Sequence, residues 1–110
     1  MLDNKKIRIG IIGLGYVGLP LAIEFGKIFN VCGFDLNKER ISQLNKYNDV
    51  NLELSEKEIK ISKFLFFSKD IKDLENCNFY IITVPTPVNE KKEPNLDFLT
   101  HATSIVAEIL

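Results

Sequence analysis

Several kinds of residue are scarce in this chain, and each scarcity excludes a class of protein. Its 110 residues include two cysteines and one histidine. Cys32 and Cys77 show neither metal-site spacing nor the pattern of a disulfide framework. The formal net charge of −1 argues against nucleic acid or an anionic membrane as a partner. No apolar run approaches the roughly 20 residues of a membrane helix, and the N-terminus lacks the apolar segment of a secretory signal. We therefore expect a cytoplasmic chain without a bound metal.

The remaining composition is that of a globular domain. Hydrophobic residues make up 45% and charged residues 26% of the chain, which is ordinary for a folded soluble protein. The length suffices for one hydrophobic core and is too short for two. We expect a single domain over residues 1–110.

Strand-like and helical patterns alternate along the chain, which predicts an α/β fold with a parallel sheet covered by helices. The expected strands are 7–12, 31–35, 65–67 and 79–84, and the expected helices are 15–28, one beginning at Asn37, one beginning at Ser55, 70–74 and one beginning near Asp97. The strand 79–84 is almost wholly apolar, as in the interior of a parallel sheet.

Two helices show clear apolar stripes, which we expect to face the sheet. In 15–28 the stripe consists of Val17, Leu21, Phe25 and Ile28, and in the last helix of Phe98, Ala102, Ile105 and Ile109. His101, between these inner positions, is expected to face outward without a catalytic role. Cys32 and Cys77 are interpreted as packing residues.

The first strand runs directly into Gly13-Leu14-Gly15-Tyr16-Val17-Gly18, a GxGxxG turn. Between a strand and a helix this pattern is typical of a dinucleotide site. Gly13 permits a sharp turn with positive φ, and Gly15 lets a diphosphate approach the backbone. Gly18 lets the helix pack closely on the strand. The first amides of the helix lack intrahelical partners and attract the phosphates.

An acidic residue, Asp35, closes the second strand about 20 residues after this turn. Its carboxylate is expected to accept hydrogen bonds from the adenosine ribose hydroxyls and to repel a 2′-phosphate, which selects NAD over NADP. Charge-assisted hydrogen bonds of about 1.5–3 kcal/mol suffice for such a preference. Lys38 and Arg40 lie just beyond and weaken the exclusion of NADP. The pattern predicts a Rossmann-like doubly wound sheet, in this chain little more than its first mononucleotide-binding half.

The wider sequence resembles the N-terminal NAD-binding domain of the UDP-glucose/GDP-mannose dehydrogenase family. The resemblance covers the whole chain and rests on the glycine turn with its continuation Leu19-Pro20-Leu21-Ala22, on Gly33-Phe34-Asp35, and on Val84-Pro85-Thr86-Pro87. The nearest relatives in this family are bacterial UDP-N-acetylhexosamine 6-dehydrogenases of surface polysaccharide synthesis.

The resemblance implies an enzyme that oxidises the C6 alcohol of a nucleotide sugar to a carboxylate, with two NAD per turnover and a covalent intermediate on a cysteine. Carried over by position, the turn residues Gly13, Gly15, Tyr16, Val17 and Gly18 hold the diphosphate, and Asp35 holds the ribose. Lys38 or Arg40 lies along the adenine edge, and Pro85 and Thr86 lie beside the nicotinamide half.

The family's catalytic cysteine, lysine and asparagine come from a later domain, and neither Cys32 nor Cys77 matches that cysteine. We therefore expect this chain to be part of a longer enzyme, a homo-oligomer at full length, and to bind NAD without turning over substrate. A β-hydroxyacid-type dehydrogenase and a short non-catalytic NAD-binding module remain alternatives; the Val84–Pro87 segment argues against the first, and the apolar last helix without a glycine stop argues against the second.

Overall fold

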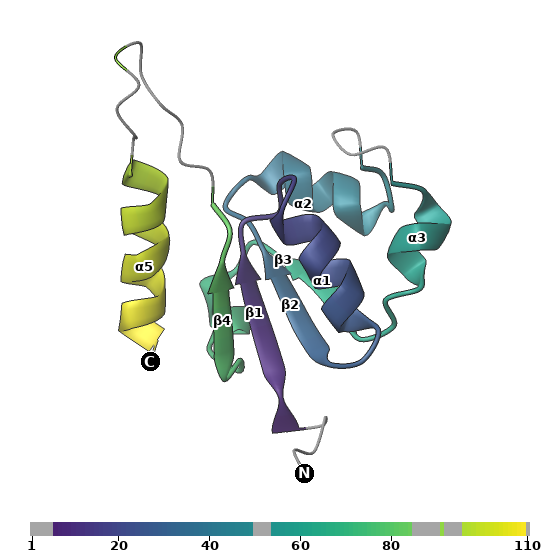
Figure 1. Ribbon diagram of the computed structural model, residues 1–110, viewed down its shortest axis with the longest axis horizontal. Coiled ribbons are helices and arrows are strands. Elements are labelled where there is room, and N and C mark those ends of the chain that lie inside the picture. Colours follow the sequence, from purple (N-terminus) through teal and green to yellow (C-terminus); the bar gives the residue numbers. More distant parts are fainter. Residues whose placement is uncertain (1–5, 50–53, 85–90, 92–95, 110) are drawn as a thin grey trace.

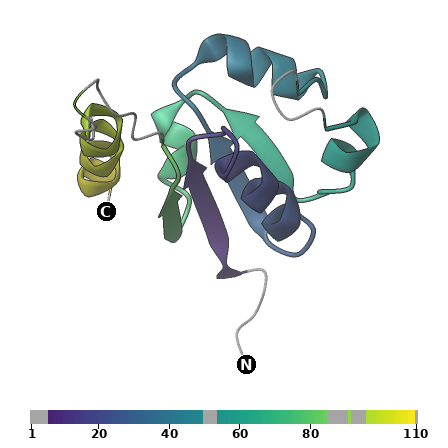
Figure 2. The ribbon, with the colours of Figure 1, turned by 45° about the horizontal axis from the view of Figure 1, so that its top comes forward.

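Four short parallel strands form one sheet in the order β3-β2-β1-β4 (Figures 1 and 2). The computed structural model describes residues 6–49, 54–84, 91 and 96–109. The strands are β1 (Arg8–Ile12), β2 (Asn30–Phe34), β3 (Leu65–Ser68) and β4 (Phe79–Ile82). The helices are α1 (Gly18–Gly26), α2 (Lys38–Asn45), α3 (Glu56–Lys60), α4 (Ile71–Leu74) and α5 (Asp97–Ile109). The predicted α/β Rossmann-like fold is confirmed.

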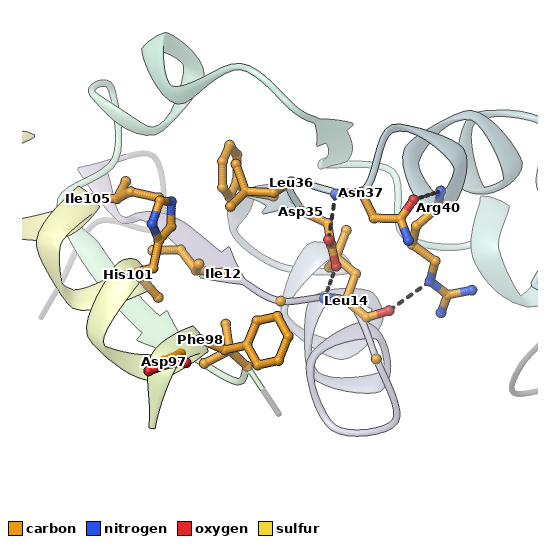
Figure 3. Close-up of a pocket in the computed structure, with 15 residues that line it drawn as sticks. Ile12, Leu14, Asp35, Leu36, Asn37, Arg40, Asp97, Phe98, His101 and Ile105 are labelled. Carbon is orange, nitrogen blue, oxygen red and sulfur yellow. Dashed lines mark hydrogen bonds between the residues drawn. The ribbon is translucent and has the colours of Figure 1, made fainter. Parts of the chain in front are cut away.

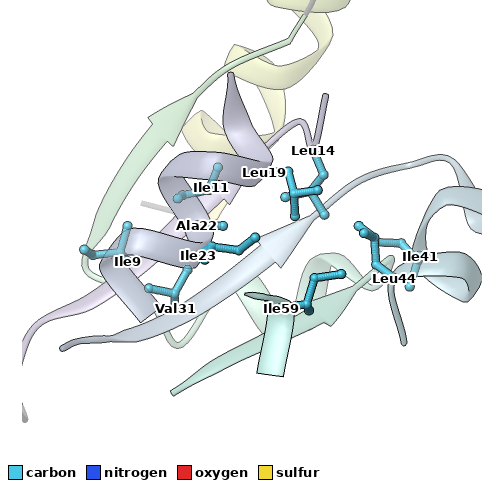
Figure 4. Close-up of a cluster of buried hydrophobic side chains, with 10 residues drawn as sticks. All are labelled: Ile9, Ile11, Leu14, Leu19, Ala22, Ile23, Val31, Ile41, Leu44 and Ile59. Atoms are coloured by element: carbon cyan, nitrogen blue, oxygen red, sulfur yellow. The ribbon is translucent and has the colours of Figure 1, made fainter. Parts of the chain in front are cut away.

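The core lies on both faces of the sheet, because alternate residues of a strand point to opposite sides. One buried cluster packs α1, α2 and α3 against β1 and β2 (Figure 4): Ile9, Ile11, Leu14, Leu19, Ala22, Ile23, Val31, Ile41, Leu44 and Ile59. The other packs α4 and α5 against the opposite face: Ile12, Cys32, Phe34, Leu74, Ala102 and Ile105. Helices on both faces are the arrangement expected for a doubly wound sheet.

Helix α1 differs from the sequence prediction in its start and in its buried face. It begins at Gly18 rather than at residue 15, and the predicted stripe is wrong at its ends, since Val17 and Ile28 are 63% and 55% exposed. The buried positions are Gly18, Leu19, Ala22, Ile23 and Gly26. Glycine and alanine recur every four residues in this set, so the face with the smallest side chains packs closest to the sheet.

Strand β4 was expected in the interior of the sheet, buried on both faces, and this expectation is wrong for the described chain. It pairs with β1 alone among the described strands and is an edge strand. Phe79 is 58% exposed, and Tyr80 to Ile82 are half-buried. In α5, Ala102 and Ile105 are buried as predicted, whereas Phe98 is 53% exposed. Within the described residues, none of the helices is long and apolar enough to cross a membrane.

Candidate dinucleotide-binding site

A pocket of about 590 Å³ opens at the carboxyl ends of β1 and β2, between the glycine turn and α5 (Figure 3). Ligands of open α/β sheets bind at this end of the strands. Its polar side is formed by the turn and by Asp35, Asn37 and Arg40. Its apolar side is lined by Ile12, Phe34, Leu36, Val84, Phe98, Ala102 and Ile105.

The three glycines of the turn have three different surroundings. Gly13 has φ +105°, a conformation that L side chains rarely adopt, and its amide donates to the Phe34 carbonyl at 2.8 Å. A Cβ on Gly15 would meet nothing within 4 Å, so this position faces open space. A Cβ on Gly18 would lie 1.7 Å from the Gly13 carbonyl oxygen. The predicted sharp turn, open approach and close helix packing are therefore all present.

The N-terminus of α1 is not capped by the chain's own side chains. Its N-cap, Val17, makes no side-chain hydrogen bond, and the first turn contains no acidic residue. The amides of residues 15–18 donate to no acceptor among the described residues. In contrast, α2, α3 and α4 are each capped by a side chain, those of Asn37, Ser55 and Asp70. Unpaired amides at a helix N-terminus form an anion site.

Pro20 is compatible with this helix because of where the helix begins. With Val17 as N-cap, Pro20 is the third helical residue. The amide of that position lacks an intrahelical acceptor in any α-helix, so proline removes no hydrogen bond. The α-helical bonds on either side of Pro20 run from the Leu19 amide to the Gly15 carbonyl at 3.2 Å and from the Leu21 amide to the Val17 carbonyl at 3.4 Å.

Asp35 lies directly after β2, and its carboxylate faces the glycine turn (Figure 3). One oxygen, Oδ2, accepts from the Leu14 amide at 2.9 Å, and Oδ1 accepts from the Asn37 amide at 2.9 Å. Two carboxylate oxygens have about four acceptor sites, so these backbone bonds leave capacity for further donors. The side chain is half-buried, and its position fits a ribose hydroxyl pair beside the turn.

Arg40 is placed differently from the expectation of a free cation beside the adenine. It is only 5% exposed. Its Nε donates to the Leu14 carbonyl at 2.8 Å, and Nη1 pairs with Asp49 Oδ1 at 2.7 Å. Asp35 and Arg40 thus fix the backbone of Leu14, the first at its amide and the second at its carbonyl. Because its charge is paired with that of Asp49, Arg40 is not the free cation expected to weaken the exclusion of a 2′-phosphate.

The other predicted ligands fall in different places. Tyr16 and Val17 have side chains that are 73% and 63% exposed, and their amides are among those without an acceptor in the described residues. Lys38 is exposed on α2 and is not among the residues that line the pocket. Pro85 and Thr86 lie outside the described residues.

Two contributions to the site were missed from the sequence. Thr83 follows β4, and its hydroxyl donates to the Gly13 carbonyl at 2.7 Å, which links the end of β4 to the glycine turn. His101 is exposed, as expected, yet it lines the pocket (Figure 3). Its position three residues after Phe98 and four before Ile105 is the helical spacing that could have revealed this shared face.

Comparison with known proteins agrees with this geometry. Residues 7–110 match the model of the UDP-glucose/GDP-mannose dehydrogenase family, NAD binding domain. The chain is 52% identical over 110 residues to a UDP-N-acetyl-D-glucosamine 6-dehydrogenase of Salmonella typhi and 44% identical over 106 residues to one of Pseudomonas aeruginosa. These alignments cover 100% and 96% of this chain and 26% and 25% of the relatives.

A solved structure gives the same assignment. The UDP-D-ManNAc dehydrogenase of Pyrococcus horikoshii superposes with a TM-score of 0.87 at 33% identity, over 94% of this chain and 26% of that one. The chain thus spans about a quarter of the length of the proteins it matches. The family match over residues 7–110 and the relative at 52% identity show that this chain belongs to the UDP-glucose/GDP-mannose dehydrogenase family, as its NAD-binding domain.

Proposed function

We propose that this chain is the cofactor-binding part of a nucleotide-sugar 6-dehydrogenase whose substrate is a UDP-N-acetylhexosamine. The observation that carries the proposal is the uncapped start of α1 directly beside Asp35. The substrate class is supported by the names of the relatives in Salmonella typhi and Pseudomonas aeruginosa, both UDP-N-acetyl-D-glucosamine 6-dehydrogenases.

The residues of the pocket suit the successive parts of NAD. The free amides of residues 15–18 bind the diphosphate, assisted by the helix dipole of roughly +0.5 charge. Asp35 accepts from the ribose hydroxyls. Arg40 lines the same pocket, and its hydrogen bond to the Leu14 carbonyl fixes the turn beside the proposed ribose position. The apolar side, including Leu36 and Phe98, suits the adenine ring. Lys38 remains a candidate for the adenine edge.

The chemistry of the complete enzyme follows from the family resemblance. NAD held by these residues would supply the hydride acceptor for the alcohol carbon, and two such oxidations would convert the C6 alcohol to a carboxylate with two NAD per substrate. Pro85 and Thr86 are proposed to lie beside the nicotinamide half. The product serves surface polysaccharide synthesis in the cytoplasm, and the full-length enzyme is a homo-oligomer.

The catalytic cysteine of this proposal is supplied by residues other than these 110. Cys32 is buried in the middle of β2, and Cys77 precedes the amino end of β4. The candidate pocket is at the carboxyl ends of the strands. We therefore expect this chain to bind NAD weakly and to show no turnover. If the gene continues past position 110 with a cysteine in a glycine-rich segment, the proposal is supported; a stop codon there would favour a non-catalytic NAD-binding module.

Calorimetric titration with NAD and with NADP tests the cofactor site. NAD is expected to bind at least about tenfold more tightly, because Asp35 repels a 2′-phosphate. Asp35→Ala should weaken NAD binding and reduce the preference. Asp70→Ala is the matched control, since Asp70 caps α4 and is not among the residues that line the pocket. Equal affinities in the unmodified chain would remove Asp35 from its proposed role.

A further inference from the structure

The two cysteines, far apart in sequence, come together on the sheet face covered by α4 and α5. Cys32 is 1% exposed and belongs to the buried cluster on this face, and Cys77 packs against the same cluster. Both also line a cavity of about 250 Å³ with Arg8 and Asp73. The cavity is lined by the amino ends of β1 and β2, at the opposite end of the sheet from the dinucleotide pocket.

The fold brings the cysteines together through Gly10. In the sheet register Gly10 stands beside Cys32 on one side and Tyr80 on the other. A Cβ on Gly10 would lie 2.9 Å from Leu74 Cδ2, so the bare glycine lets α4 pack onto β1. The Tyr80 hydroxyl lies 2.6 Å from the Leu74 carbonyl oxygen and 2.9 Å from that of Cys77. These contacts hold the α4–β4 connection over β2.

The environment makes the two thiols unequal. A hydrogen bond from Cys32, with a smaller contribution from the nearby Arg8 charge, lowers the pKa of Cys77 against the opposing effect of burial. The same bond raises the pKa of Cys32, and burial raises it further. Arg8 is fixed here because its Nε donates to the Asn76 carbonyl. The half-buried Cys77 is therefore the more acidic and the more accessible thiol of the pair, and the thiolate is the reactive form of cysteine.

We propose that Cys32 and Cys77 form a redox-active thiol pair that closes to an intramolecular disulfide when a hydroperoxide reaches Cys77. Cys77 is the attacking thiol, because it is the accessible member, and buried Cys32 is the resolving thiol. We do not propose a metal site at this pair, because no group of three or more potential ligand side chains gathers in the described part of the chain. The proposal is independent of the dinucleotide site.

With hydrogen peroxide as the oxidant, the reaction proceeds in two balanced steps. The Cys77 thiolate sulfur attacks one peroxide oxygen, the O–O bond breaks, and the departing hydroxide takes up a proton to form water. The Cys32 sulfur then attacks the resulting sulfenic sulfur, the S–S bond forms, and the S–O bond breaks. The Cys32 proton leaves with that hydroxide as a second water. The two thiols lose two electrons, which the peroxide gains.

Peptide mapping by mass spectrometry after treatment with stoichiometric hydrogen peroxide tests the pair. The expected product is a monomer that has lost two hydrogen atoms, with a Cys32–Cys77 linked peptide that dithiothreitol releases. Native Cys77 should also react with iodoacetamide at least about tenfold faster than Cys32, because Cys32 is buried and protonated. A monomer that keeps both thiols, a disulfide between two chains, or sulfinic acid on Cys77 without the link would overturn the proposal.

Two variants assign the roles within the pair. Cys32→Ala should accumulate a Cys77 sulfenic acid that dimedone traps, whereas Cys77→Ser should leave the Cys32 thiol intact. Reaction of Cys32 with peroxide in Cys77→Ser would contradict the assignment of Cys77 as attacking thiol. If Cys32→Ala fails to fold, the linked peptide in the unmodified chain still tests whether the disulfide forms. Calorimetry with NAD should show affinities within about twofold for the reduced and disulfide forms, since the pair lies away from the pocket.

Discussion

At the scale of single residues, the site is built around the backbone of Leu14. Its amide donates to Asp35 and its carbonyl accepts from Arg40, so two charged side chains fix the residue between the first two glycines of the turn. The Leu14 side chain is fully buried in the core, and this packing anchors the turn. The next amides, those of residues 15–18, have no acceptor among the described residues, and a backbone fixed in this way reorganises little when it binds an anion.

The glycines give a test in which binding and stability separate. Gly15→Val should abolish NAD binding with the free energy of unfolding nearly unchanged, because its Cβ enters open space where the diphosphate is expected. Gly18→Ala should instead destabilise the fold, since its Cβ would collide with the Gly13 carbonyl oxygen and Thr83 Oγ1. Thermal unfolding and calorimetric titration measure the two effects. Binding retained in Gly15→Val would place the cofactor elsewhere.

The Arg40–Asp49 ion pair should contribute far more to stability than an exposed pair. Its side chains are 6% and 0% exposed, and removing one partner of a buried pair costs about 3–5 kcal/mol. We expect Arg40→Met to lose stability on this scale in urea unfolding. The control is Lys27→Met, which breaks an exposed pair with Glu24 at a cost of about 0–1 kcal/mol. Similar losses in both variants would contradict a structural role for Arg40.

At the scale of elements, α1 is distinguished from its neighbours by what it lacks. The helices α2, α3 and α4 begin with side-chain caps, whereas α1 begins at an uncapped Val17. A cap would satisfy amides that the proposed site needs for the cofactor. The missing cap thus lowers helix stability and leaves a binding surface, a common relation between stability and function.

Val17→Asp should stabilise the fold and weaken NAD binding. A carboxylate at the start of α1 interacts favourably with the helix dipole and should stabilise the fold by about 0.3–1 kcal/mol. It should also repel the diphosphate and weaken NAD binding by at least about tenfold, less so at high salt. The control, Val17→Asn, introduces a similar shape without charge. Unchanged NAD affinity in Val17→Asp at low salt would show that phosphate does not bind at this helix end.

At the scale of the whole molecule, the two faces of the sheet have different tasks. The cluster under α1, α2 and α3 supports the glycine turn from one side. The cluster with α4 and α5 supplies the apolar wall of the pocket and, at the other end of the strands, brings the cysteines together. A side-chain truncation of equal size should therefore affect NAD binding differently on the two faces.

Ile105→Ala and Ile59→Ala form a matched pair for this division. Both isoleucines are buried, at 5% and 3% exposure, and each truncation should cost about 2–5 kcal/mol. Ile105 lines the pocket and Ile59 does not, so NAD affinity should fall only in Ile105→Ala. Measurements at a temperature where both variants are folded separate the effects. An equal fall in affinity in both would mean that α5 is not a specific wall of the site.

The sequence alone determined the fold class, the order of elements and the position of the glycine turn. The reason is local: strands, caps and the glycine turn depend on residues a few positions apart, so Gly13, Gly15, Gly18, Asn37 and Ser55 could be interpreted without a structure. Asp35 followed from its fixed spacing after the turn.

Only the tertiary structure decided which helix face is buried, what Arg40 does and which distant residues meet. The sheet-facing side of α1 depends on how closely Gly18 can approach Gly13, and the guanidinium of Arg40 is directed by Leu14 and Asp49. Three features depend on residues from different elements: the hydrogen bond from Thr83 to the turn, the place of His101 in the pocket wall, and the Cys32–Cys77 pair. Such contacts arise from packing between elements, which no periodicity within one element encodes.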